Sequence, residues 1–459
     1  MPEPDASLES ILELAQAGRW SAIRPLLADR HPADLAHLIV RAPSEAHARL
    51  FRLLPDELKP AVLAELEGEA GEDVILALSS SALSEIVEDM APDDAADVLG
   101  ELSSERSAEV LELMDEAESG ELRQLLTYDE DSAGGIMTTD VLGFREGATV
   151  QEAIQAIAYF EGDEPVFYAY VIDAQGRLFG YVHLWELLKQ RDKRQTLVTL
   201  ADRDVVRATV DMDQEEAAKL MARYDLSALP VVDAAGRLVG RVTIDDAIDV
   251  IEEEASEDIL RLAGSDDEDL THASVLRSCR IRLPWLLVTL CTGFVTSVIL
   301  KQFVSHVSEI LVLSFFVPIV LAMGGNTGVQ SSTLIVRRIA LGSMYGKSVL
   351  QLLFKEMLVG AVMGLLCGVA IGVWAYYLIS VSPGYLPSLS PLELCLIVSL
   401  SLLGAMTFAA ISGASVPVLL HSLGIDPAVA SGPFVTTAND ISALLIYFGF
   451  TVALVRIFV

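Results

Sequence analysis

Five long apolar segments in the last two fifths of the chain constrain its fold more than any other feature. They cover residues 283–304, 310–336, 350–381, 391–418 and 427–455. Each reaches the roughly 20 residues that a helix needs to cross a ~30 Å hydrocarbon core. Because backbone amides in lipid must be hydrogen-bonded within the protein, these segments predict five membrane-spanning helices.

The remainder of the chain differs from this part in charge. Residues 1–276 hold 60 acidic and 22 basic side chains, a net charge of −38, whereas residues 277–459 hold 5 and 9, a net charge of +4. An acidic soluble part is therefore joined to an apolar membrane part. Its charge argues against nucleic acid as a partner and favours metal cations, or simply solubility.

One carboxylate, Asp440, lies within the last apolar segment. It falls about twelve residues into that segment, which is on the order of 18 Å along a helix. A charge near the middle of a bilayer costs at least ~2.5 kcal/mol, so an intramembrane acid indicates function and a polar surrounding. The alternative is an aspartic acid that is protonated or hydrogen-bonded to a neighbouring helix.

Two predicted spans, the second and the fifth, carry glycine and polar residues where lipid-facing helices carry none. We expect these helices to be broken there and to line a water-filled path; the alternative is close helix packing through small residues. The candidate pore residues are Gly324, Gly325, Asn326, Gly328, Gln330, Gly432, Thr436, Thr437, Asn439 and Asp440.

Residues 1–130 predict an acidic, all-α domain. Apolar residues recur at helical spacing, and four segments open with a proline followed within two residues by an acid, at Pro32, Pro43, Pro55 and Pro92. Proline and carboxylates suit the first turn of a helix, where amides are free and the helix dipole is positive. Short helices restarted in this way indicate a solenoid-like stack of helix pairs.

Residues 131–256 contain an internal repeat, with copies at about 136–198 and 199–256. Val171-Ile-Asp-Ala-Gln-Gly-Arg-Leu-Phe-Gly-Tyr-Val182 returns sixty residues later as Val231-Val-Asp-Ala-Ala-Gly-Arg-Leu-Val-Gly-Arg-Val242. Each copy predicts a strand, an Asp/Gly turn and a second strand, with amphipathic helices before and after. This tandem α/β unit resembles a pair of CBS modules.

Residues 257–276 predict an acidic helix that connects the repeat to the membrane domain, 277–459. Arginines before the first span and after the second place those loops in the cytoplasm. A multi-pass protein of the plasma (inner) membrane follows, in contact with membrane lipid, with its N-terminal domains cytoplasmic and its C-terminus outside. Arg456 at that terminus is a mild signal to the contrary.

The polar spans and Asp440 favour a cation pore. One acid per chain cannot cage a divalent ion, but a two-fold homodimer would bring two Asp440 side chains together. Mg²⁺ suits such a site, because it retains its waters and is held by one or two carboxylates. His and Cys, which zinc prefers, are absent from these polar spans.

The whole domain order resembles the MgtE family of magnesium channels. The motifs Gly324-Gly-Asn-Thr-Gly-Val-Gln330, Pro433-Phe-Val-Thr-Thr-Ala-Asn-Asp440 and Glu254-Ala-Ser-Glu-Asp-Ile-Leu-Arg-Leu-Ala-Gly264 carry the resemblance. It implies a homodimer that passes hydrated Mg²⁺ and is not an enzyme, with Asp440 as the ion-selecting acid. It also implies closure by cytosolic Mg²⁺, bound by Asp93, Asp97, Asp213, Glu215, Asp225, Asp246, Asp249, Glu254, Glu257 and Asp426.

Several alternatives stay open from the sequence. Where some family members contact a nucleotide, this chain has Leu226, Trp185 and Glu186, so nucleotide binding by the CBS pair is uncertain. The transported ion could be cobalt or nickel. An intramembrane aspartyl protease would need a second deep acid, and Glu356 and Glu393 are placed at span ends. A receptor without flux would leave the polar spans unexplained.

Overall fold

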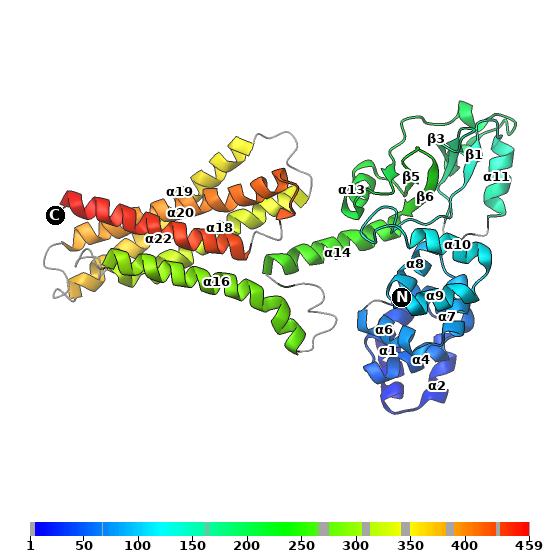
Figure 1. Cartoon of the computed structure of the whole chain (residues 1–459), viewed down its shortest axis with the longest axis horizontal. Coiled ribbons are helices and arrows are strands. Elements are labelled where there is room, and N and C mark those ends of the chain that lie inside the picture. The colour runs from blue at the N-terminus through cyan, green and yellow to red at the C-terminus, as the bar shows by residue number, and fades with distance from the viewer. Residues whose placement is uncertain are drawn as a thin grey trace. The chain divides into compact units, whose positions relative to one another are not determined.

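The computed structural model describes residues 5–66, 68–160, 162, 165–263, 265, 275–304, 313–340, 349–381, 390–427 and 432–458. The chain divides into two compact units, Met1–Glu254 and Ala255–Val459. Each unit has a hydrophobic core of its own. The first unit contains the strands, whereas the second is all-helical (Figure 1).

The first unit begins with short helices that pack as neighbours. Among them α4 packs on α6, α7 on α9 and α8 on α10. The elements are α1 (Asp5–Gln16), α2 (Trp20–Leu27), α3 (Pro32–Val40), α4 (Ser44–Leu53), η1 (Asp56–Leu58), α5 (Lys59–Ala64), α6 (Gly68–Ala77), α7 (Ser80–Glu88), α8 (Pro92–Gly100), α9 (Ser104–Leu113) and α10 (Glu116–Leu125).

The four prolines predicted to open helices all lie at helix starts. Pro32 and Pro92 are the first residues of α3 and α8, and Pro43 and Pro55 directly precede α4 and η1. The first turn of a helix tolerates proline because its amide has no helical partner there.

Two small sheets of the same design follow. In the first, β1 is parallel to β2, and β2 is antiparallel to β3; in the second, β4, β5 and β6 repeat this arrangement. Val171 pairs with Gly180 and Val231 with Gly240, so the register repeats at the sixty-residue offset of the sequence. The elements are β1 (Gly143–Arg145), α11 (Val150–Ala158), β2 (Tyr168–Ile172), β3 (Leu178–His183), α12 (Leu184–Lys189), η2 (Leu197–Thr199), β4 (Ala208–Thr209), α13 (Gln214–Tyr224), β5 (Ala228–Val232) and β6 (Leu238–Thr243).

One apolar core runs from the helical domain into the second module. It contains residues of α3 to α10 together with Ala217, Leu229 and Val242 of the second module. The first module packs a smaller core of its own around Val150 and Val171. The helical domain is thus continuous with the second module through buried apolar side chains.

A single helix, α14 (Ile244–Ala263), leaves the second module. The sequence predicted a helix over 245–253 and a separate connecting helix over 257–276. In the structure one helix covers both as far as Ala263, because no residue within it breaks the helical pattern. Residues 264 and 266–274 lie outside the described residues.

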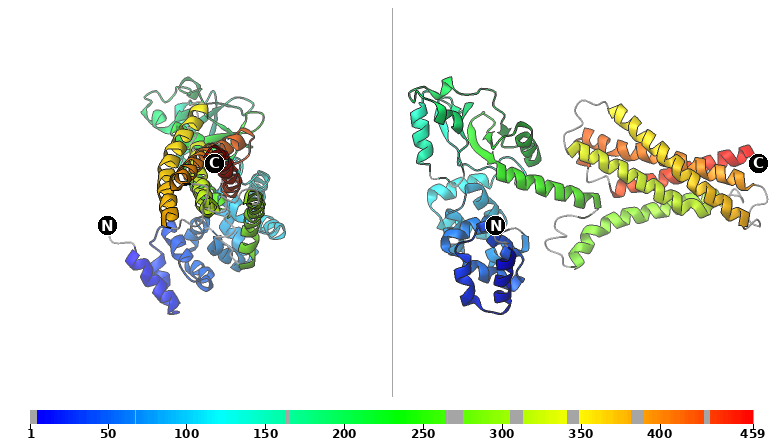
Figure 2. Two further views of the ribbon diagram at one scale, coloured as in Figure 1. Left: turned by 90° about the vertical axis from the view of Figure 1, so that its left-hand side faces the viewer. Right: turned by 180° about the vertical axis from the view of Figure 1, so that it is seen from behind.

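The second unit contains five helices long and apolar enough to cross a membrane, within its described residues. They lie roughly side by side in two views (Figures 1 and 2). They are α16 (Val275–Val304), α18 (Val317–Ala340, preceded by η3, Ser314–Phe316), α19 (Val349–Val381), α20 (Pro391–Ser422) and α22 (Pro433–Phe458).

Glycines let two of these helices approach closely. Gly360, Gly364, Gly368 and Gly372 recur every fourth residue along α19 and face α20. A Cβ atom added at Gly368 would lie 2.7 Å from the Ser399 carbonyl oxygen, so no larger residue fits there. Small residues at such contacts are typical of helices that pack within a bilayer.

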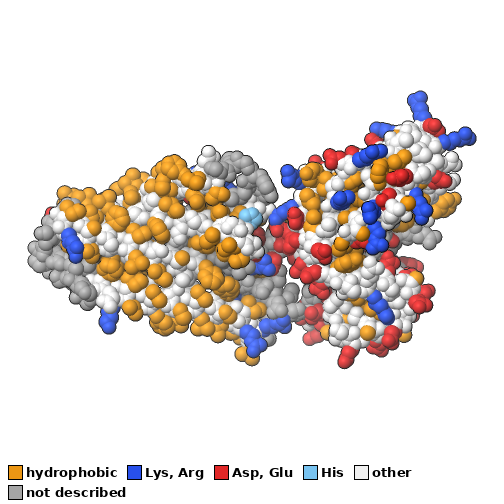
Figure 3. All heavy atoms as spheres, turned by 45° about the horizontal axis from the view of Figure 1, so that its top comes forward, with side chains coloured by type: hydrophobic (Ala, Val, Ile, Leu, Met, Phe, Trp, Pro, Cys, Tyr) orange, Lys and Arg blue, Asp and Glu red, His pale blue; other side chains and the backbone are white. Residues whose placement is uncertain are grey.

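The two units differ in surface chemistry (Figure 3). Apolar side chains cover much of the visible face of the helical second unit, whereas acidic side chains are frequent on the first unit. An apolar outer surface is what a bilayer requires of a spanning bundle.

Candidate ion-conducting site

Asp440 lies nearer to a helix end than the sequence predicted. The helix that carries it begins at Pro433, whose ring suits the first turn, and residues 428–431 lie outside the described residues. Asp440 is therefore seven residues into α22, about 10 Å along it. This places the acid in the first third of the helix, not at its midpoint.

The surface opposite Asp440 is formed by a glycine of α18. A Cβ atom added at Gly325 would lie 3.6 Å from Asp440 Oδ1 and 3.8 Å from Thr436 Cγ2. Thr436, one turn before Asp440, shares this face and donates its hydroxyl to the Gly432 carbonyl at 3.0 Å. Asp440 and Thr436 are half-buried in the single chain. The carboxylate and the Thr436 methyl group thus both face Gly325 of α18, and within the described residues Asp440 has no ion pair.

Asn439 occupies a different position from its neighbour. Its side chain is 0 % exposed and rests on Gly328, where an added Cβ would lie 1.6 Å from Asn439 Nδ2. Gly413 of α20 packs closely against Gly328, since a Cβ added at Gly413 would lie 2.2 Å from the Gly328 carbonyl oxygen. The sequence grouped Asn439 and Gly328 with the pore; the structure places them where three helices cross.

The expected break in the second span is absent. α18 is a continuous helix through its glycine and polar stretch, and the prediction of a broken helix was wrong. The Thr327 hydroxyl donates a hydrogen bond to the Met323 carbonyl oxygen, one turn earlier, at 2.7 Å. The hydroxyl is therefore hydrogen-bonded without any loosening of the helix backbone. Gly324 and Gly325 are buried, whereas Asn326 and Gln330 are exposed on the single chain.

The remaining residues of the fifth-span motif flank Asp440. Gly432 precedes α22 and is half-buried. The Thr437 hydroxyl is buried without a hydrogen-bond partner among the described residues.

Arg261 connects two acids that the resemblance assigns to metal binding. Its guanidinium donates to Asp426 Oδ2 at 2.7 Å, where Asp426 lies between α20 and α22, and it also pairs with Glu257 one turn earlier on α14. The sequence analysis did not single out Arg261. The i,i+4 spacing could have predicted the ion pair between Arg261 and Glu257. Nothing in the sequence near Arg261 indicates that Asp426, 165 positions away, is its second partner.

In the first unit, acids of α8 lie near the start of α14. Burial, then the charges of Asp246 and Asp97, raise the pKa of Asp94 to about 7. Desolvation by the surrounding protein, then the charge of Asp246, raises the pKa of Asp97 to about 7, although its side chain stays open to solvent. Burial also raises the pKa of Asp246, to about 6. Asp94 was missed by the sequence analysis, although it shares a helix face with Asp97 at i,i+3 spacing.

The other predicted acids are distributed along the second module. Asp213 caps α13 by accepting from the amides of Glu215 and Glu216 at 3.0 and 3.2 Å, and Glu215 pairs with Lys219. Gln214 donates to Glu254 Oε1 at 3.1 Å. Asp225, Asp249 and Asp93 complete the predicted set: Asp225 ends α13 with a φ of 54°, Asp249 is exposed on α14, and Asp93 is 3 % exposed on α8.

Thr243 and Asp246 form the start of α14. The amide and hydroxyl of Thr243 donate to Asp246 Oδ2 at 3.2 and 2.7 Å. This arrangement is typical of a helix start, where a side-chain oxygen accepts from an amide that has no partner within the helix.

No three candidate ligands among His, Cys, Asp and Glu converge on one point within the described part of the chain. The acids instead form pairs and looser groups. Such an arrangement suits Mg²⁺, which is held through one or two carboxylates and keeps several waters, better than it suits Zn²⁺ or Ca²⁺.

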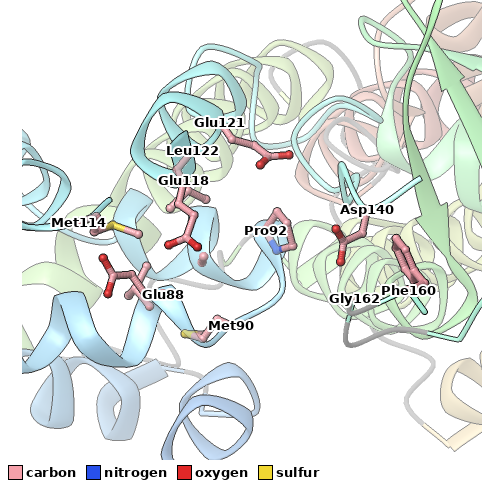
Figure 4. A pocket seen from close by; sticks show the side chains of 12 residues that line it. Glu88, Met90, Pro92, Met114, Glu118, Glu121, Leu122, Asp140, Phe160 and Gly162 are labelled. Atoms are coloured by element: carbon pink, nitrogen blue, oxygen red, sulfur yellow. The ribbon is translucent and has the colours of Figure 1, made fainter. Parts of the chain in front are cut away.

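A pocket of about 380 Å³ lies elsewhere, in the first unit (Figure 4). Glu88, Glu118 and Glu121 line one side, and Asp140 and Phe160 line the other. Partial burial and the charge of Glu88 raise the pKa of Glu118. The pocket is formed by residues outside the membrane helices and is separate from Asp440.

Known proteins match the chain over most of its length. The family model described as a divalent cation transporter matches residues 317–450, the MgtE intracellular N domain matches 30–131, and the CBS domain matches 133–193 and 198–253. The chain is 38 % identical to the magnesium transporter MgtE of Thermus thermophilus over 95 % of its own length and 96 % of that protein. It is 35 % identical to the magnesium transporter MgtE of Enterococcus faecalis over 73 % and 72 % of the two chains.

Among solved structures, the cytosolic domain of the Mg²⁺ channel MgtE in complex with ATP is 37 % identical. It covers 53 % of this chain and 99 % of that one, with a TM-score of 0.49.

Proposed function

This chain belongs to the MgtE family of divalent cation transporters, and on that premise we propose that it takes up Mg²⁺ across the plasma membrane as a homodimer closed by cytosolic Mg²⁺. The C-terminus lies outside in this proposal. The observation that carries it is Asp440, a half-buried carboxylate on a membrane helix that faces the glycine surface of α18.

The geometry around Asp440 favours a hydrated ion. Gly325, which lies opposite the acid, has no side chain, so this surface supplies neither the additional side-chain oxygen ligands that Ca²⁺ takes nor the His and Cys ligands of Zn²⁺. One carboxylate is too little to hold a divalent ion, and a second copy of the chain would supply another at a two-fold axis. Asn326 and Gln330, exposed on the single chain, are then available to line the path between copies.

The acids of the first unit support regulation by the same ion. Beyond the effect of burial, the charge of Asp246 raises the pKa of Asp94 and of Asp97, and the charge of Asp97 raises that of Asp94, which means that these charges repel when bare. A divalent ion between such groups replaces repulsion with attraction, and it shifts the population toward the state that binds it better. We infer that Mg²⁺ bound to these acids and to Asp213, Glu215, Asp225, Asp249, Glu254, Glu257 and Asp426 stabilises the closed state.

Flux into liposomes tests the proposal. The wild-type chain should pass Mg²⁺, and Asp440→Asn should lower that flux by about tenfold or more, since tenfold corresponds to only ~1.4 kcal/mol of lost ion binding. Glu393→Gln is the matched control, because Glu393 is a half-buried membrane-unit acid like Asp440 and caps α20 by accepting from the Ser390 amide at 2.7 Å. Normal flux through Asp440→Asn would refute the assignment, and preference for Co²⁺ or Ni²⁺ in the same assay would identify a different cargo.

A further inference from the structure

Glu356 of α19 is a buried carboxylate that the proposed transport mechanism leaves without a role. The sequence placed it at a span end, but the structure buries it to 5 % exposure, seven residues into α19. Ser331 of α18, itself 4 % exposed, donates its hydroxyl to Glu356 Oε2 at 3.1 Å. Burial of an acid in a membrane protein is costly, which indicates that the position serves a purpose.

The helix that carries Glu356 is closely packed one turn before and one turn after this residue. One turn before it on α19, Leu352 packs with Ile335 and Ala414 in an apolar cluster. One turn after it, Gly360 is pressed against α20, since an added Cβ would lie 2.6 Å from the Ala410 Cβ. The carboxylate therefore lies between two closely packed turns of α19, and the contact that can give it a role is its hydrogen bond with Ser331.

Glu356 holds the helix that faces Asp440. Ser331 is one turn from Gly328, which rests under Asn439, and six residues from Gly325, which faces Asp440. A rotation of α18 by about 20° would shift its Cα atoms by about 0.8 Å, given a helix radius of ~2.3 Å. The Gly328–Asn439 contact cannot absorb such a shift, because even one added carbon has no space there.

We propose that Glu356 is a positioning residue for the ion path: its hydrogen bond with Ser331 fixes the rotation of α18 and so keeps the Gly325 surface opposite Asp440. The proposal rests on the assignment of Asp440 as the ion-selecting acid. It requires an acceptor oxygen at position 356 and does not require a negative charge.

Three variants test this role in liposome flux. Glu356→Gln retains an acceptor oxygen and should keep Mg²⁺ flux within about twofold, whereas Glu356→Leu and Ser331→Ala each remove one partner. Those two should lower flux about tenfold and also lower the preference for Mg²⁺ over Ca²⁺, because small misplacements at a site are costly. The double variant Glu356→Leu, Ser331→Ala should lower flux no further than either single variant does, because both changes remove the same contact. Glu393→Leu, at a half-buried acid of the same unit that lies at a helix start, should keep normal flux and normal preference.

Two results would overturn the proposal. If Glu356→Gln is as defective as Glu356→Leu, the charge matters and not the hydrogen bond. If Glu356→Leu and Ser331→Ala transport and select normally, the contact has no role. Size-exclusion profiles and thermal unfolding identify variants that fail to fold, and Ser331→Ala is the mildest of the set.

A second measurement does not depend on flux. With the four native cysteines replaced, Thr436→Cys reports on the Gly325 surface through its rate of maleimide labelling. Ser331→Ala and Glu356→Leu should change that rate, whereas Glu356→Gln should not. Loss of Mg²⁺ transport by the wild-type chain would refute the proposed function, whereas equal labelling rates in all variants would refute the role of Glu356.

Discussion

The two units use the same chemical group, the carboxylate, in opposite ways. The first unit brings Asp94 and Asp97 close enough to Asp246 for its charge to raise the pKa of both, in addition to the effect of burial. In the second unit, four acids have four different surroundings: Asp440 faces glycine, Glu356 accepts from Ser331, Glu393 caps α20 and Asp426 pairs with Arg261. Crowded acids respond to cation concentration, whereas isolated acids can be positioned for selection.

The separate positions of the acids in the second unit depend on close contacts between helices. Of the variants considered, Gly328→Ala should disturb these contacts most. The added carbon would meet Asn439 Nδ2 at 1.6 Å, and overpacking of this kind costs about 1–3 kcal/mol or more. We expect a lower unfolding temperature in detergent and loss of Mg²⁺ flux. Gly449→Ala in α22 is the control, because an added Cβ there has nothing within 4 Å. Equal behaviour of the two variants would contradict the importance of the three-helix crossing.

Crowding in the first unit can be removed by the triple change Asp94→Asn, Asp97→Asn and Asp246→Asn. With fewer charges to bridge, internal Mg²⁺ should inhibit flux several-fold less, while flux at low internal Mg²⁺ stays near that of the wild type. Inhibition is measured by flux at a series of internal Mg²⁺ concentrations.

A control with the same loss of charge separates the local cluster from net charge. Glu105, Glu112 and Glu216 are exposed acids of the first unit, and their triple change to Gln should leave inhibition unaltered. If both triple variants relieve inhibition equally, the crowding of Asp94, Asp97 and Asp246 is not the sensor.

The raised pKa values also predict the pH dependence of stability. In the unfolded chain an aspartate has a pKa near ~3.9, whereas Asp94 and Asp97 have pKa values of about 7 when folded. The folded state therefore binds more protons between about pH 4 and 7, so stability decreases as pH rises through this window. Thermal unfolding of residues 1–263 in chelator should show this decrease, and added Mg²⁺ should reduce it. A flat profile would indicate that these acids do not repel.

The smallest effect is expected at Arg261, because the ion pair is partly exposed. Arg261 and Asp426 are each 36 % exposed at the side chain, and ion pairs near the surface contribute only ~0–1 kcal/mol. Arg261→Gln would remove the positive charge that pairs with both Glu257 and Asp426, so a metal ion would no longer compete with it for these two acids. The Mg²⁺ concentration for half-inhibition should fall by about two- to fivefold. Arg261→Lys, which keeps the charge, should stay closer to wild type; a rise in that concentration for Arg261→Gln would reverse the interpretation.

The matches to family models and to a curated relative confirm the family and the fold class that were predicted from the sequence. The predicted helix starts at Pro32 and Pro92 and the sixty-residue repeat are also confirmed. These features are local or periodic, and the chain expresses them through composition, spacing and turn residues. Where the sequence reasoning was wrong, as with the broken second span, a tertiary contact was decisive: glycines that could have loosened α18 instead let α20 and α22 approach it.

The sequence by itself determined that five helices cross a membrane, that an acidic part precedes them and that one acid, Asp440, lies among polar residues. Only the tertiary structure decided which acids act together. The pairing of Arg261 with Asp426 joins residues 165 positions apart, and that of Ser331 with Glu356 joins two helices. Hydropathy and periodicity describe each segment alone, whereas burial, the pKa of a carboxylate and its hydrogen-bond partner depend on residues that only folding brings near.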